Sequence, residues 1–183
     1  MPNHYFYAVK LPTKTKQFLH QWTIENKGYF PFQRWVHSED YHITLAFLGF
    51  AEAEQLNCSV QAVRQICHQF SSFYLTLQNI GTFGRPEAPR IFWADTAKSN
   101  ELNDLQQQIY QKVSKCGFQL DPKPFKPHIT LARKWNEVYP FPKEELPSFI
   151  SDSHTFQVDE IVLYKTHMDK TPKYEIVELF PLN

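Results

Sequence analysis

The sequence lacks an excess of charge of either sign. Its 19 Lys and Arg residues balance 19 Asp and Glu residues, so the formal net charge at pH 7 is zero. A protein that holds long nucleic acid through many phosphate contacts needs a basic surface. The balance therefore argues against that class of protein. A small anionic ligand, or one end of a nucleic acid, needs only a local positive patch and stays compatible with the composition.

Long apolar segments are also missing. No run approaches the ~18 consecutive apolar residues that a membrane-spanning helix requires. The first residues, MPNHYFYAVKLPTKTK, carry polar residues and a proline within their apolar stretch, which is not the pattern of a signal peptide. We therefore expect no membrane association.

Cysteine is scarce. The three cysteines, Cys58, Cys67 and Cys116, form an odd set without any CxxC spacing. This pattern favours neither a disulfide framework nor a zinc site. We therefore expect reduced thiols in the core of a cytoplasmic protein that needs no metal and no cofactor.

The chain does contain many strand-like segments and a few helical ones. Strand patterns fall at residues 4–11, 34–37, 41–50, 73–83, 90–96, 128–133, 154–166 and 173–182. Helical patterns fall at about 12–26, 56–70 and 99–116. Strands outnumber helices and do not alternate regularly with them, which predicts an α+β fold with largely antiparallel sheets.

One pentapeptide occurs twice. The sequence HITLA stands at residues 42–46 and again at residues 128–132. Each half of the chain carries one copy and a long helix, and the spacing is far too long for a solenoid repeat. We therefore expect residues 1–183 to form a single domain of two similar, intertwined lobes, each contributing one HITL strand to a central cleft.

An H-x-T triplet on a strand has a defined geometry. Alternate side chains point to opposite faces, so His42 and Thr44 share one face while the apolar residues between and after them face the core. His128 and Thr130 share a face in the same way. Neighbouring side chains on one face stand roughly 6.8 Å apart. Two such strands facing each other would place two imidazoles on opposite sides of one phosphorus atom.

Two imidazoles and two hydroxyls suit phosphoryl transfer. A histidine with a pKa near its usual value of about 6.5 can accept a proton from attacking water, or donate one to the leaving oxygen. Threonine hydroxyls can stabilise the charge of the non-bridging oxygens. A single H-x-T triplet can arise by chance and usually marks an ordinary half-buried strand. The second copy favours a site, although a purely structural duplication, with the histidines far apart, remains an alternative.

The chain resembles the 2H phosphoesterase superfamily, which is defined by two H-x-[ST]-x motifs. Within it, the chain is similar to the bacterial RNA 2′,3′-cyclic phosphodiesterases, first known as 2′-5′ RNA ligases. The resemblance runs through RWVHSEDYHITLAFLGF, FGRPEAPRIFWADT, FKPHITLARKW and LYKTHMDKTPKYEIVELFPL, and so covers nearly the whole chain. It implies two pseudo-symmetric lobes, each of mainly antiparallel sheet with outer helices, around a central cleft.

The resemblance also implies an activity and its residues. The activity is the metal-independent opening of a terminal 2′,3′-cyclic phosphate on RNA to a 2′-phosphate, together with a joining reaction that forms a 2′-5′ bond. Position by position, His42 is the proton donor, His128 the proton acceptor, and Thr44 and Thr130 complete the two motifs. Arg133 lies where these enzymes carry an arginine that contacts the phosphate.

The position of Arg133 conflicts with simple strand alternation. Counting from His128, Arg133 falls on the opposite face, so a bulge or the end of the strand near Ala132 is needed to turn it inward. The alternative is an exposed arginine at the end of a strand. Arg85 and Arg90 flank the loop GRPEAPR and either reach an RNA phosphate beyond the reacting one or are simply solvated.

The residues around the two motifs differ in charge. Four cationic residues surround the second motif, namely Lys123, Lys126, Arg133 and Lys134, and these disfavour a protonated His128. Glu39 and Asp40 precede the first motif, and we expect them to raise the pKa of His42. Both effects agree with His42 as acid and His128 as base. The motifs themselves are identical and do not assign the roles.

Two other functions stay open. The first is a nucleotide-binding 2H module that does not turn its ligand over. The second is a phosphodiesterase of small cyclic nucleotides. For the leading hypothesis, we expect a monomer whose partner is RNA with a 2′,3′-cyclic phosphate end.

Overall fold

The structure is a computed structural model that describes residues 3–146 and 154–183. Within these residues, nine strands form one antiparallel sheet in the order β7-β4-β5-β6-β3-β1-β8-β9, with β2 paired to β6. The strands are β1 (His4–Lys10), β2 (Phe32–Trp35), β3 (His42–Phe50), β4 (Phe73–Arg85), β5 (Ala88–Thr96), β6 (Ile129–Trp135), β7 (Thr155–Val158), β8 (Glu160–Thr166) and β9 (Tyr174–Pro181). The helices are α1 (Thr13–Asn26), α2 (Ala53–Gln69) and α3 (Asn100–Lys115), with short 3-10 turns η1 (Ser38–Asp40) and η2 (Lys143–Glu145). The predicted α+β fold with mainly antiparallel pairing is confirmed.

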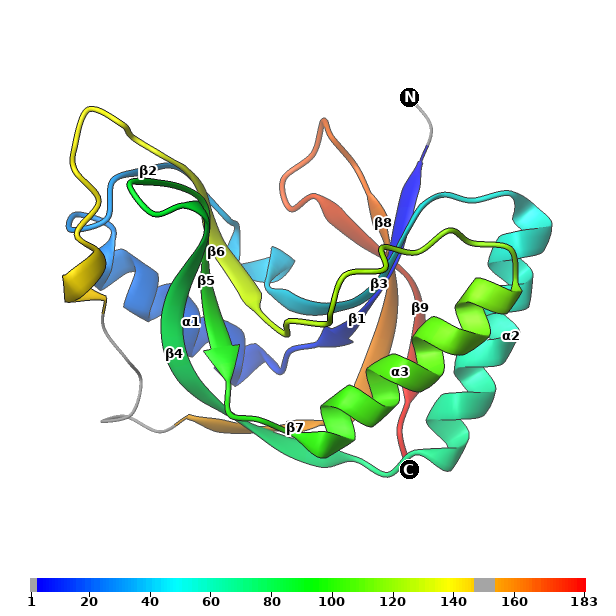
Figure 1. Ribbon diagram of the computed structural model, residues 1–183. Helices are drawn as coiled ribbons and strands as arrows, with labels where there is room; N and C mark the ends of the chain where they lie inside the picture. Colours follow the sequence, from blue (N-terminus) through cyan, green and yellow to red (C-terminus); the bar gives the residue numbers. More distant parts are fainter. Residues whose placement is uncertain (1–2, 147–153) are drawn as a thin grey trace.

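The sheet consists of two halves that meet in its middle (Figure 1). One half contains β3, β1, β8 and β9, and the other contains β6, β5, β4 and β7. The pairing between β3 and β6 consists of Ile43 opposite Ile129. The two HITL strands are therefore neighbours at the centre of the sheet.

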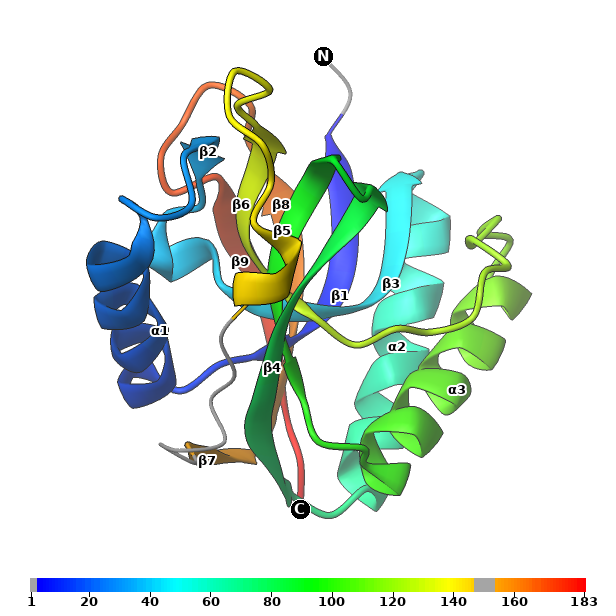
Figure 2. The ribbon, with the colours of Figure 1, turned by 60° about the vertical axis from the view of Figure 1, so that its left-hand side comes forward.

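The helices cover the two halves unequally (Figure 2). Helices α2 and α3 pack together against the half that contains β3 and β9. Helix α1 covers the other half, where Trp22 lies near the buried ring of Phe92. Of the three helices in the described residues, two therefore cover one half-sheet and one covers the other.

One crossing divides a segment that the sequence pattern predicts as a single strand. Residues 155–158 pair with β4 in one half-sheet, while residues 161–166 pair with β1 in the other. Asp159 lies between these strands and is exposed. The residues on both sides of Asp159 are strand-like in sequence, so the change of partner is invisible in the sequence.

The central strands bury one face as predicted. Ile43 and Ile129 are fully buried, whereas His42 and Thr130 are only partly buried. Burying a side chain of this size stabilises the fold by roughly 1.5–3 kcal/mol. The apolar face of each HITL strand thus fixes the strand in the core, which leaves the polar face available for chemistry.

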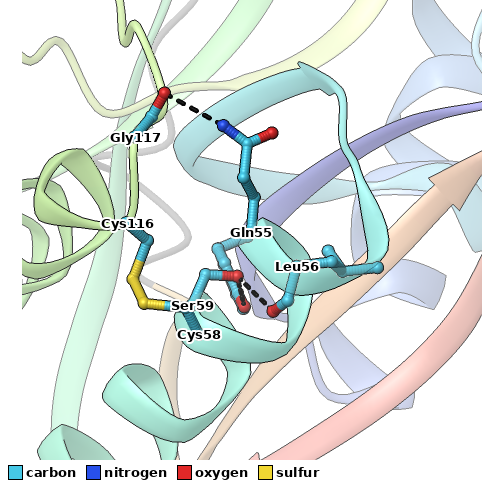
Figure 3. The surroundings of a disulfide bond; sticks show 7 residues. Gln55, Leu56, Cys58, Ser59, Cys116 and Gly117 are labelled. Atoms are coloured by element: carbon cyan, nitrogen blue, oxygen red, sulfur yellow. Dashed lines mark hydrogen bonds between the residues drawn. A yellow bond between two sulfur atoms is a disulfide. The ribbon is translucent and has the colours of Figure 1, made fainter.

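The expectation of three reduced core thiols is wrong. The structure joins Cys58 of α2 to Cys116, which follows α3, with the two Cα atoms 5.8 Å apart (Figure 3). Cys58 is exposed, and only Cys67 is a buried free thiol. The pairing depends on the packing of α2 against α3, which the spacing of the cysteines does not reveal.

Polar contacts surround this disulfide. The Gln55 side-chain amide donates a hydrogen bond to the Gly117 carbonyl at 3.2 Å, so α2 also holds the turn after α3 (Figure 3). The Ser59 hydroxyl donates to the Leu56 carbonyl at 2.8 Å and is itself within 2.8 Å of the Tyr7 hydroxyl. The disulfide thus lies in a region that is already cross-linked by hydrogen bonds.

Loss of the disulfide is expected to destabilise the protein without affecting the central strands. A bridge that closes a loop of 58 residues contributes about 4 kcal/mol to the free energy of unfolding, according to the chain-entropy model. Guanidinium unfolding of the double variant Cys58→Ser/Cys116→Ser should therefore show a lower midpoint than that of the oxidised wild type. Dithiothreitol should lower the wild-type midpoint and leave the variant unchanged. Equal midpoints for variant and wild type would contradict the assignment.

No helix in residues 3–146 and 154–183 is both long enough and apolar enough to span a membrane.

Candidate active site

A pocket of about 230 Å³ opens over the centre of the sheet. Its lining comes from both half-sheets and comprises His4, Phe6, His42, Thr44, Phe47, Ile91, His128, Thr130, Arg133, Thr166 and Tyr174. The five side chains that the resemblance assigns to the site therefore border the same space. This result contradicts a purely structural duplication, which required the two histidines to lie far apart.

The two histidines are held in the same way. His42 Nδ1 lies 2.7 Å from the Asp40 carbonyl, and His128 Nδ1 lies 2.7 Å from the Lys126 carbonyl. A carbonyl oxygen only accepts, so each Nδ1 must carry the proton. The second nitrogen, Nε2, is then free to accept or donate a proton. His42 Nε2 also lies 3.1 Å from the Thr44 hydroxyl.

A bulge in β6 brings Arg133 to the pocket. Phe92 of β5 pairs with Ala132, and the adjacent Trp93 pairs with Thr130, so Leu131 is the extra residue in the ladder. Leu131 and Ala132 are both fully buried, which breaks the alternation of buried and exposed positions. The bulge reverses the register, and Arg133 joins the face of His128 and Thr130. The bulge that Arg133 needs in order to face the pocket is therefore present in β6.

Sequence reasoning missed the residue that positions Tyr174. The buried carboxylate of Asp40 accepts hydrogen bonds at 3.0–3.1 Å from the backbone N–H groups of Lys173 and Tyr174. These bonds attach the start of β9 to the residues just before the first motif. The Tyr174 ring then lies 5.1 Å from that of His42, edge to face. The partners are more than 130 residues apart along the chain, so no local signal connects them.

Aromatic rings support both imidazoles. Phe6 lies beside His42, and Phe83 lies edge to face against His128, each with ring centroids 4.9 Å apart. Phe83 in turn packs on Trp93, whose ring occupies the space where a side chain on Gly81 would begin, only 2.2 Å from the position of its Cβ. Glycine at position 81 is therefore needed for the support behind His128.

Burial lowers the pKa of both imidazoles. The pKa of His42 falls to about 4, first because its surroundings exclude water, and further because His128, Arg133 and Lys16 are positively charged or can be. The pKa of His128 is lowered mainly by burial and then by Arg133. Hydrogen bonds to the Asp40 and Lys126 carbonyls oppose these shifts.

The expectation that Glu39 and Asp40 raise the pKa of His42 is wrong. The Asp40 carboxylate is turned toward backbone N–H groups at the start of β9, and the Glu39 carboxylate pairs with Lys16 at 3.0 Å. The effect of these carboxylates on the imidazole is too weak to offset the lowering of the His42 pKa by burial. Adjacency in sequence does not place these carboxylates beside the imidazole, because neighbouring residues in this turn point in different directions.

These shifts predict the pH dependence of the free protein. His42 should take up its proton only as the pH falls toward 4, whereas the unfolded chain does so near 6.5. Between these values the unfolded state binds more protons, so acidification destabilises the fold and stability rises with pH. The imidazole NMR signals of His42 should titrate well below 6.5, and bound inorganic phosphate should move the midpoint upward. A midpoint above 6.5 in the free protein would contradict this account.

No three His, Cys, Asp or Glu side chains form a group able to hold a metal ion in the described parts of the chain, residues 3–146 and 154–183.

A mainly antiparallel α+β fold that brings two H-x-T strands to one pocket is the arrangement expected of a 2H phosphoesterase. The chain belongs to the 2′-5′ RNA ligase superfamily, whose family model matches residues 12–170. It is 44% identical over 180 residues to an RNA 2′,3′-cyclic phosphodiesterase of Geobacillus stearothermophilus, covering 98% of this chain and 57% of that protein. It is 33% identical to a protein of the same name from Bacillus subtilis, covering 98% and 97% of the two chains.

Solved structures show the same fold. The crystal structure of Escherichia coli LigT complexed with 3′-AMP superposes with a TM-score of 0.83 at 25% identity, covering 100% of this chain and 99% of that one. The crystal structure of a protein of Thermus thermophilus superposes with a TM-score of 0.81 at 25% identity, covering 98% and 97%.

Proposed function

We propose that the protein hydrolyses a terminal 2′,3′-cyclic phosphate on RNA to a 2′-phosphate by general acid-base catalysis with two histidines. The observation that carries this proposal is the common pocket of His42, Thr44, His128, Thr130 and Arg133. The names of the Geobacillus and Bacillus relatives, which match nearly all of this chain, support the substrate class.

The two imidazoles supply the general base and the general acid of the proposed reaction. Neutral His128 accepts a proton from water through Nε2 as the water oxygen attacks phosphorus. The bond from phosphorus to the ribose 3′ oxygen breaks, and protonated His42 donates its Nε2 proton to that oxygen. The product is a 2′-phosphate and a free 3′-hydroxyl, and both histidines return to their starting states by exchange with solvent.

The remaining polar groups stabilise charge on the non-bridging oxygens. The Thr44 and Thr130 hydroxyls donate hydrogen bonds from the two motifs, and Arg133 offers a planar pair of N–H donors. A negatively charged phosphate also offsets the effect of burial on the imidazoles. It raises the pKa of His42 and so favours the protonated acid in the complex. The low pKa of the ligand-free site is therefore compatible with an acid at neutral pH once substrate is bound.

The joining reaction uses the same geometry with a different nucleophile. The 5′-hydroxyl of a second RNA takes the place of water and attacks the cyclic phosphate, and the product is a 2′-5′ phosphodiester. We expect this reaction to be slower than hydrolysis, because water competes for the same position.

The remaining parts of the proposal are a metal-independent reaction, a cytoplasmic location, a monomer, and a single domain of two intertwined lobes.

The proposal is tested with an oligonucleotide that ends in a 2′,3′-cyclic phosphate, incubated with the protein in EDTA. Turnover that persists in EDTA is expected, because the imidazoles and Arg133 supply the acid, the base and the positive charge. Loss of turnover that is restored by a divalent metal would contradict a metal-independent reaction. Stoichiometric binding of the nucleotide without hydrolysis would favour a binding module instead.

A further inference from the structure

A larger hollow adjoins the pocket. It measures about 700 Å³, lies across β5, β6 and β2, and shares Ile91 and Arg133 with the pocket. Figure 1 shows these strands side by side in one half of the sheet. We call this hollow the basic groove, and its lining is Arg34, Phe83, Gly84, Arg85, Ala88, Pro89, Arg90, Ile91, Arg133, Lys134, Trp135 and Glu137.

The charge of the basic groove contrasts with that of the chain. Its lining includes four arginines and one lysine but a single acidic residue, Glu137, although the whole sequence is neutral. Glu137 lies 3.4 Å from Arg85, and both side chains are about two-thirds exposed, so this pair contributes little. Within residues 3–146 and 154–183, no ion pair engages Arg34, Arg90 or Arg133. An excess of positive charge therefore faces the groove.

Two of these arginines are placed directly against each other. Arg34 of β2 pairs with Arg133 of β6 across the ladder, and Ile91 of β5 lies on the other side of Arg133. Like charges that face each other across a strand pair destabilise a sheet. An anion bound beside both guanidinium groups attracts each of them, so the repulsion between Arg34 and Arg133 is replaced by a net attraction. The pair therefore favours an anionic ligand that extends from the pocket past Arg133 to Arg34.

The backbone around the groove is shaped to bring the cations close. Gly84 has a φ of +113°, and a Cβ there would lie 2.8 Å from the backbone nitrogen of Arg90. The glycine thus permits the tight approach of β4 and β5 that places Arg85 and Arg90 at the rim. Lys134 has a φ of 61°, a conformation that is unfavourable for a residue with a side chain. Lys134 is still part of β6, because the next residue, Trp135, pairs with Phe32 of β2.

We infer that the basic groove binds the phosphodiester backbone of the nucleotides that precede the cyclic phosphate, with Arg34 and Arg90 as phosphate contacts. The inference rests on the proposed function. An RNA that ends in a 2′,3′-cyclic phosphate has no nucleotide beyond it, so every additional phosphate belongs to the preceding nucleotides. The preferred substrate class is therefore an oligonucleotide, and a cyclic mononucleotide leaves the groove empty.

The test compares two substrates, a 2′,3′-cyclic mononucleotide without a 5′-phosphate and a short oligonucleotide with the same cyclic end. The readout is the ratio of kcat/KM for the oligonucleotide to kcat/KM for the mononucleotide. Arg34→Gln and Arg90→Gln should each lower this ratio by about tenfold, because a charge-assisted contact to phosphate is lost. Each should also reduce the salt dependence of oligonucleotide binding, by about 0.7 in the slope of log K against log salt. Lys112→Gln, an exposed position on α3 outside the groove, is the matched control and should leave the ratio unchanged.

The outcomes separate this inference from the proposed function. Both arginines are exposed, so thermal melts of the variants should match that of the wild type. Turnover of both substrates with a ratio that the arginine variants do not change, or with a wild-type ratio near one, overturns the inference alone. If neither substrate is turned over, the proposed function is wrong, and the inference fails with it.

Discussion

Replacing either His42 or His128 with alanine should lower kcat on cyclic-phosphate RNA by roughly 10³-fold or more. Each imidazole holds its Nδ1 proton against a backbone carbonyl, which leaves Nε2 as the nitrogen that exchanges protons in the pocket. Without His42 the leaving oxygen departs unprotonated. Without His128 the attacking water keeps its proton. Steady-state assays of both variants against the wild type measure the effect.

The double variant and a control sharpen this prediction. Groups that act as a unit are strongly non-additive, so His42→Ala/His128→Ala should lose little more than either single variant. His20→Ala removes an exposed histidine on α1 that lies outside the pocket, and it should retain wild-type turnover. Survival of most activity in either active-site variant would refute the two-histidine mechanism.

Replacing Arg133 with glutamine should lower kcat/KM by about 10²- to 10³-fold, the usual effect of removing a donor aimed at a developing negative charge. The arginine reaches the pocket only because of the bulge at Leu131. Arg133→Lys keeps the charge but loses the paired N–H donors, so it should restore only part of the loss. Kinetics of the two variants with one cyclic-phosphate substrate provide the measurement.

The Arg133→Gln variant also has a second readout that separates a role in the site from a structural one. Arg133 lowers the pKa of both His42 and His128, so its removal should raise both. NMR titration of the two imidazoles tests this directly. Normal kcat/KM together with unchanged imidazole titrations would show that Arg133 is an exposed residue at the end of a strand.

Much of the fold could be predicted because it follows local patterns. The alternation in HITL predicts which face of each central strand is buried, and Ile43 and Ile129 are buried as expected. The amphipathic spacing of α3 places Leu102, Leu105 and Ile109 in the core. The identity of the two pentapeptides predicts that their histidines meet, and both line the pocket.

The features that escaped prediction depend on contacts between distant segments. The disulfide needs the packing of α2 against α3, and the change of partner at Asp159 needs two strands from different half-sheets. The direction predicted for the pKa shift of His42 was wrong for a related reason. Asp40 precedes it in sequence, but the carboxylate turns to the start of β9 instead. The sign of a pKa shift follows from the direction of side chains and from burial, which the sequence does not display.

The central claim is that water, activated on one side of phosphorus, displaces the ribose 3′ oxygen on the opposite side, with one imidazole at each. Analysis of the product formed from a cyclic-phosphate oligonucleotide in oxygen-18 water, with 2′- and 3′-phosphates resolved, tests it most directly. The account predicts a 2′-phosphate only, with one labelled oxygen on phosphorus. A 3′-phosphate, or a phosphate without the label, would contradict it.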